Sequence, residues 1–150
     1  MSTVKTVSGS RTSLTSSSLA TLASANYCVS STKDNTTNQP IDLMVEVTLA
    51  TTNTPSGNKQ AVVFCQASYD NSNWQTGPTT GSTTTDEPLL TFLGTIPLAS
   101  ASTTETKAFP VAPAYGGNLP PYVRIIVKND LGVALTSGSI NTSEISATVA

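Results

Sequence analysis

Apolar and polar residues alternate in several short blocks along this chain. The clearest block, residues 41–49, has an apolar side chain at every second position: Ile41, Leu43, Val45, Val47 and Leu49. A period of two turns one row of side chains toward a core and the other row outward, as in a β-strand with one buried face. We therefore expect a strand here.

Other segments have strand character and are separated by turn-forming residues. They are residues 61–69, 89–98, 105–111, 122–129 and 140–150, with residues 19–31 as a candidate first strand region. In the last segment Ile145, Ala147 and Val149 fall on one face, and in segment 122–129 Ile126 falls on the face opposite Ile125. No window has helical periodicity, so the chain is predicted to be all-β, an antiparallel, jelly-roll-like β-sandwich.

The first 18 residues contain few large apolar side chains. Such a segment gains little free energy by folding alone. We interpret residues 1–18 as an extended N-terminal arm and residues 19–150 as the sandwich, since a chain of this length fits one domain.

The composition favours strands and excludes some classes of partner. The chain contains 26 Thr and 20 Ser, residues that favour strands and turns over helices. Its 7 basic and 9 acidic residues form no basic stripe, so nucleic acid is not an expected partner. No apolar run has the length of a membrane span, and the N-terminus lacks the apolar core of a secretory signal, so we expect synthesis and assembly in a cytoplasm.

Catalytic chemistry finds little support in the sequence. The chain has no histidine, which excludes every triad or metal site that depends on imidazole. Two groups of oxygen-bearing residues could hold calcium, although we interpret both as ordinary turns: Asp34, Asn35, Asn38 and Asp42, and then Asp70, Asn71 and Asn73. We expect no cofactor, no metal and no enzymatic activity.

Two features remain open at this stage. Cys28 and Cys65 lie in separate predicted strands, and we interpret them as buried free thiols rather than a disulfide. A long connection, residues 70–88, carries the only tryptophan. Trp74, together with Tyr69, is either an aromatic platform for a sugar ring or an anchor that packs on the sandwich.

Two segments carry a resemblance to a known class: LASANYCVSSTKDNTTNQPIDLMVEVTL and PYVRIIVKNDLGVALTSGSI. They resemble small virion structural proteins of tailed bacteriophages, of the capsid decoration or cement type. The resemblance implies a jelly-roll or related sandwich on the capsid surface, with the major capsid protein as partner and a homotrimer as the oligomeric state.

Three functional hypotheses follow. The first is a cement protein whose arm contacts the shell through Lys5, Arg11 and Leu14, since an arm can pair with a neighbouring sheet edge. The alternative is a carbohydrate-binding or host-adhesion module that uses Tyr69 and Trp74 to bind a cell-surface glycan. A hydrolase of unusual chemistry is the third.

Overall fold

The computed structural model describes residues 3–16, 18–83 and 87–149. Within these ranges, ten strands and three short 3₁₀ helices follow one another. The strands are β1 (Val4–Ser8), β2 (Thr12–Leu14), β3 (Tyr27–Val29), β4 (Lys33–Asp34), β5 (Asp42–Thr51), β6 (Gln60–Ser68), β7 (Thr91–Pro97), β8 (Thr103–Pro110), β9 (Tyr122–Asp130) and β10 (Ser137–Val149). The 3₁₀ helices are η1 (Leu19–Thr21), η2 (Glu87–Leu89) and η3 (Ala112–Tyr115).

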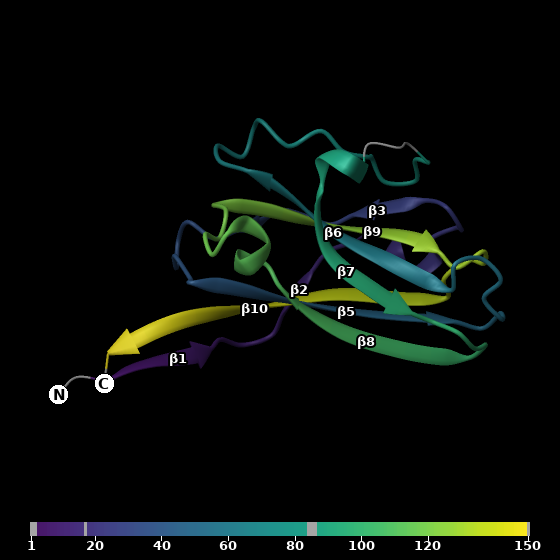
Figure 1. The fold of residues 1–150 in the computed structure, drawn as a ribbon, viewed down its shortest axis with the longest axis horizontal. Coiled ribbons are helices and arrows are strands. Elements are labelled where there is room, and N and C mark those ends of the chain that lie inside the picture. Colours follow the sequence, from purple (N-terminus) through teal and green to yellow (C-terminus); the bar gives the residue numbers. More distant parts are fainter. Residues whose placement is uncertain (1–2, 17, 84–86, 150) are drawn as a thin grey trace.

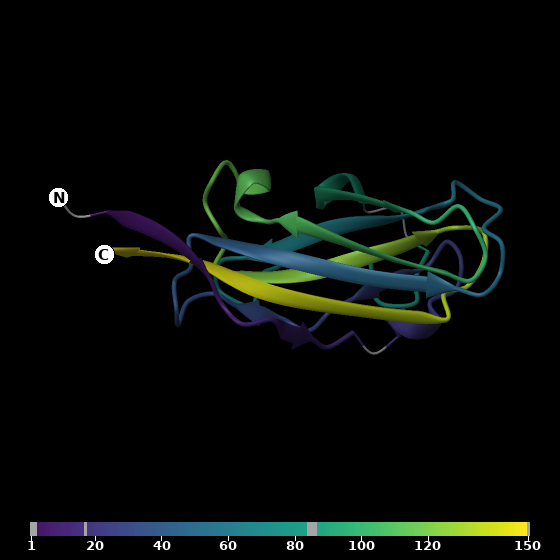
Figure 2. The ribbon, with the colours of Figure 1, turned by 90° about the horizontal axis from the view of Figure 1, so that it is seen from below.

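Two antiparallel sheets pack face to face, which confirms the predicted β-sandwich (Figures 1 and 2). Sheet A has the order β1-β10-β5-β8, with β2 also paired to β10, and sheet B has the order β3-β9-β6-β7, with β4 also paired to β9. Strands from the first half of the chain therefore pair with strands from the second half. The innermost pair in sequence is β6 with β7, which follow each other along the chain. This is the jelly-roll arrangement.

The core fills the space between the sheets. Inward residues of β5 (Leu43, Val45, Val47 and Leu49) face inward residues of β9 (Val123, Ile125 and Val127), and all of them are 0% exposed. The alternation read from residues 41–49 is thus the alternation of β5, apart from Ile41, which precedes the strand and is 48% exposed.

A second apolar cluster lies on the outer side of sheet B, formed by Tyr27, Phe64, Leu90 and Ile126. The connection between β6 and β7 covers it. Within that connection, Ser82 accepts a hydrogen bond from the Tyr27 N–H, and Gly81 donates one to the Tyr27 carbonyl. The long loop is therefore a packed cover over much of its described length.

The Tyr27 hydroxyl and Lys128 Nζ both donate to the carboxylate of Glu87, which fastens the end of this cover to sheet B. Burial raises the pKa of Glu87, but the hydrogen bonds from Lys128 and Tyr27 outweigh it, so the pKa lies below its ordinary value.

Both cysteines are buried free thiols, as predicted. Cys28 lies on β3 and Cys65 on β6, and β9 runs between these two strands. Two strand spacings separate them by about 10 Å, beyond the reach of a disulfide. Burial raises the pKa of the Cys65 thiol to about 12, so it is unreactive at neutral pH.

We expect Ile126→Ala to lower the free energy of unfolding by about 2–4 kcal/mol, as much as Ile125→Ala, because the cover buries Ile126 as completely as the core between the sheets buries Ile125. Urea titration of the two variants measures this. A cost below about 0.5 kcal/mol for Ile126→Ala, typical of a surface position, would show that the cover does not form.

Candidate functional site

The N- and C-terminal strands form a two-stranded ribbon that extends beyond the sandwich (Figures 1 and 2). β1 pairs with the last residues of β10, from Val4 opposite Val149 to Ser8 opposite Ile145. β5 accompanies β10 only as far as Asp42, which is opposite Ile145. Residues 146–149 therefore have β1 as their neighbour in the sheet.

Residues directly opposite each other share a face of an antiparallel pair. One face of the ribbon continues the outward side of sheet A, and we call it the outer ribbon face: Val4, Thr6, Ser8, Ile145, Ala147 and Val149. Val4 is 68% and Val149 is 74% exposed. Val7 lies on the opposite face and is 49% exposed.

The sequence correctly placed Ile145, Ala147 and Val149 on one face of the last strand. That face points outward, and no other described element covers its end. A two-stranded ribbon that no third strand or other element covers has only marginal stability in water, and this one also exposes valines. The ribbon therefore indicates a surface that contacts another molecule.

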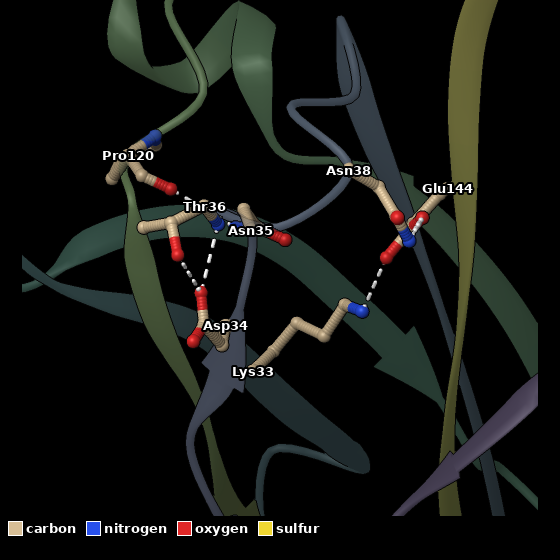
Figure 3. A network of polar contacts seen from close by, with 7 residues as sticks. All are labelled: Lys33, Asp34, Asn35, Thr36, Asn38, Pro120 and Glu144. Carbon is tan, nitrogen blue, oxygen red and sulfur yellow. Dashed lines mark hydrogen bonds and ion pairs between the residues drawn. The ribbon is translucent and has the colours of Figure 1, made fainter.

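A polar cleft of about 300 Å³ lies at the base of the ribbon, lined by Gly9, Ser10, Thr12, Lys33, Asn38, Thr142 and Glu144. Lys33 from β4 in sheet B reaches Glu144 of β10 in sheet A, with Nζ 2.5 Å from Oε1 (Figure 3). Asn38 donates to the other carboxylate oxygen at 2.8 Å. These contacts close one end of the sandwich.

The hydrogen bonds from Lys33 and Asn38 lower the pKa of Glu144. A depressed carboxyl pKa adds stability above its ordinary value of 4.5, and this stability is lost as the pH falls through the folded-state pKa. The ammonium and carboxylate also neutralise each other. The cleft therefore presents a tie between the sheets rather than a poised acid or base.

The side chains considered as calcium ligands form hydrogen bonds with separate partners. Asp34 accepts from the Thr36 N–H and hydroxyl, and Asn35 donates to the carbonyl of Pro120 (Figure 3). Asp42 accepts backbone N–H bonds from Val111 and Ala112. No three acidic or cysteine side chains among the described residues gather around a common point.

Asp70 closes an Asx turn by accepting the backbone N–H groups of Ser72 and Asn73. These two bonds, Asn73 first, hold the pKa of its carboxyl far below the ordinary range. Tyr69 directly precedes this turn and is 75% exposed, whereas Trp74 follows the turn and lies opposite Ser68. The segment Asp70–Asn73 is therefore an ordinary turn, as expected from the sequence.

Trp74 is half-buried, and the Arg124 guanidinium carbon lies 3.8 Å from its ring centroid. Arg124 thus occupies one face of the indole and also donates to Thr32. Trp74 anchors the loop, which is one of the two roles considered for it, and Tyr69 is left as the exposed aromatic ring.

The three residues predicted for arm contacts have different environments. Lys5 is exposed on β1, whereas Arg11 forms an ion pair with Glu46 on the outward side of β5. Leu14 pairs with Ile140 and is only 7% exposed, because β2 lies along the core-covered part of β10. The assignment of Leu14 as a contact is therefore corrected, and the side chain belongs to the core.

Comparison with known proteins does not place the chain in a family. No protein-family model and no curated protein sequence matches the chain. Crystal structures of wild-type BuGH86 and of a point variant, both in complex with neoagarooctaose, align with a TM-score of 0.47 at 13% identity. The alignments cover 99% of this chain and 20% of those chains, so this chain spans about a fifth of their length. Likeness of this degree carries no statement about ligands.

None of the helical segments in the described ranges has the length and apolar character needed to cross a membrane.

We expect Glu144→Gln to lower the free energy of unfolding at pH 7 by about 1 kcal/mol, because it removes the charged acceptor of Lys33. The difference from wild type should shrink as the pH falls below 4.5, where the wild-type carboxylate also becomes protonated. Urea titrations between pH 7 and pH 3 measure it. Glu105→Gln on the exposed strand β8 is the matched control, and a pH-independent difference would contradict the ion-pair assignment.

Trp74→Ala should lower the free energy of unfolding by about 1–2 kcal/mol, since it removes the surface on which Arg124 stacks. Tyr69→Ala should stay within about 0.5 kcal/mol of wild type. Thermal denaturation compares the two variants. Equal, negligible effects would show that Trp74 is not an anchor.

Proposed function

We propose that this protein is a non-enzymatic structural component of a virion that binds the outer capsid surface and stabilises the shell. The observation that carries the proposal is the outer ribbon face, a surface with exposed valines held clear of the body on an extension of sheet A. Its support also includes the sequence resemblance to capsid decoration proteins and the absence of histidine from the chain.

The contact would be mainly hydrophobic. Val4 and Val149 lie opposite each other and are 68% and 74% exposed, so burying them against a shell removes two apolar side chains from water. Full burial of a valine is worth about 1.5 kcal/mol, so one such contact is weak. Repetition over the symmetric shell would supply avidity.

Lys5 lies on the same ribbon, on its opposite face, and is available at the rim of such a contact. The major capsid protein is the partner that this proposal names, with binding after assembly in the host cytoplasm. The homotrimer implied by the resemblance is a state at three-fold positions of the shell, and it stays a prediction for the shell-bound protein.

The double variant Val4→Thr, Val149→Thr tests the proposal, because threonine keeps the β-branched shape and adds a hydroxyl to the contact. We expect at least a tenfold loss of co-sedimentation with capsids that lack the protein, with no change in thermal stability. A tenfold loss corresponds to about 1.4 kcal/mol. Val7→Thr makes the same change on the opposite ribbon face and should bind normally. Undiminished binding by the double variant would contradict the proposal.

The alternative function, a carbohydrate-binding or host-adhesion module, is favoured by one observation, the 75% exposed ring of Tyr69. An exposed aromatic face can stack on a saccharide. Retention of the wild-type protein on immobilised cell-surface glycans, lost in Tyr69→Ala and kept in the ribbon double variant, would select this alternative.

A further inference from the structure

Sheet edges expose unpaired backbone groups and are normally blocked. The edge of sheet B at β3 is covered by residues 80–82 of the loop. Strand β8 carries Glu105 and Lys107 and ends at Pro110, and β7 ends at Pro97 with a bulge against β6. Charge, proline and bulges are the usual protection of such edges. Strand β1 has five exposed residues, and Lys5 is its one protection, since the strand contains no proline and no bulge.

The register shows which backbone groups of β1 are free. The Gly9 N–H donates to the Glu144 carbonyl at 2.7 Å, and these residues continue the β1–β10 register directly after Ser8 and Ile145. Hydrogen-bonded pairs alternate in an antiparallel ladder, so Lys5 and Val7 also bond to β10. The N–H and C=O groups of Val4, Thr6 and Ser8 therefore point away from β10, toward the open side.

We propose that β1 pairs antiparallel with β1 of a second copy of this chain, about a two-fold axis through Thr6. Thr6 then lies opposite Thr6 of the second copy, and Val4 lies opposite Ser8 at each end. Every outward-pointing N–H and C=O group of β1 finds a partner, with two hydrogen bonds in each of these pairs, roughly six in all. Sheet A becomes continuous across two molecules.

The strand's sequence, VKTVS, suits this register. Its only charged residue, Lys5, lies opposite Val7 of the second copy, whose apolar surface can pack against the lysine stem. A register centred on Lys5 would place two ammonium groups opposite each other. A register centred on Val7 would leave the free groups of Val4 without partners.

The shape of the molecule also permits the pairing. The ribbon extends beyond the sandwich (Figure 1), and Val4 opposite Val149 is its outermost pair. An antiparallel partner strand runs the other way, so the second sandwich lies beyond the tip of the first ribbon and the two bodies do not compete for space. The contact is isologous, so it removes the open edge of both copies and stops at a dimer.

A second copy of this chain thus fits this edge. The register pairs the free backbone groups, the two Lys5 side chains do not face each other, and the assembly stops at a dimer. The pairing does not require the proposed shell binding. It would join the two outer ribbon faces, because Val149 and Val4 of one copy then lie in the same cross-strand row as Ser8 and Ile145 of the other.

Thr6→Pro is a selective test, because proline removes an N–H that points away from β10 and leaves the bonds of Lys5 and Val7 intact. Sedimentation velocity should show a wild-type dimer, a Thr6→Pro monomer with at least a tenfold lower association constant, and a Thr6→Val dimer. Circular dichroism and thermal denaturation verify the fold. A wild-type monomer at all concentrations, or undiminished self-association of Thr6→Pro, would overturn the proposal.

Cysteine cross-linking tests the register without proline. The Cα atoms of a hydrogen-bonded pair lie about 5.5 Å apart, within disulfide range. Under mild oxidation Thr6→Cys should give a covalent dimer, whereas Val4→Cys should not, because Val4 faces Ser8 of the second copy. The native cysteines are buried and serve as an internal control. Failure of Thr6→Cys to cross-link, or equal cross-linking of both variants, would contradict the two-fold at Thr6. Co-sedimentation of the monomeric and dimeric variants with capsids is measured as a separate experiment.

Discussion

Strand β10 is the element on which the rest of sheet A depends. Over its first part it pairs with β5 on one side and β2 on the other, and its inward residue Ile140 joins the core. Over its last part it leaves β5 behind and pairs with β1. One continuous strand therefore serves as both core and extension. The direction of the ribbon is therefore set by the part of β10 that pairs with β5 and β2 in the sandwich.

The base of this extension is held by charge rather than by apolar packing. Lys33 and Asn38 converge on Glu144, at the point where β10 passes out of the sandwich (Figure 3). The ion pair joins the two sheets at the end from which the ribbon projects, and Gly9 bonds to the Glu144 backbone at the same position. The surface at this base is therefore polar, and the exposed apolar side chains lie on the outer ribbon face, further along β10.

Much of the sandwich could be predicted because each long strand carries its own alternation. The block from Leu43 to Leu49 marks β5 without reference to any other segment. The position of Ile126 could not be read this way. A period of two says that it faces away from Ile125, but its burial depends on a loop that returns from elsewhere in the chain. The uninterrupted apolar run Ile125–Val127 was the available signal of a strand covered on both faces.

The candidate site was harder to foresee, because it is made by non-local pairing. Residues 4–8 contain two valines and look like a polar tail until they are placed beside residues 145–149, at the other end of the sequence. Leu14 looked like an anchor for the same reason, although pairing with Ile140 puts it in the core. The sequence left Trp74 as either platform or anchor, and the structure places Arg124 over one face of its ring.

Site-resolved amide hydrogen exchange along β1 tests the central claim most directly, since it reads which backbone groups the ribbon leaves free. The Lys5 and Val7 amides should be protected at every protein concentration. The Thr6 and Ser8 amides should exchange rapidly in dilute solution and become protected as the concentration rises. Equal exchange of all four amides, independent of concentration, would contradict it.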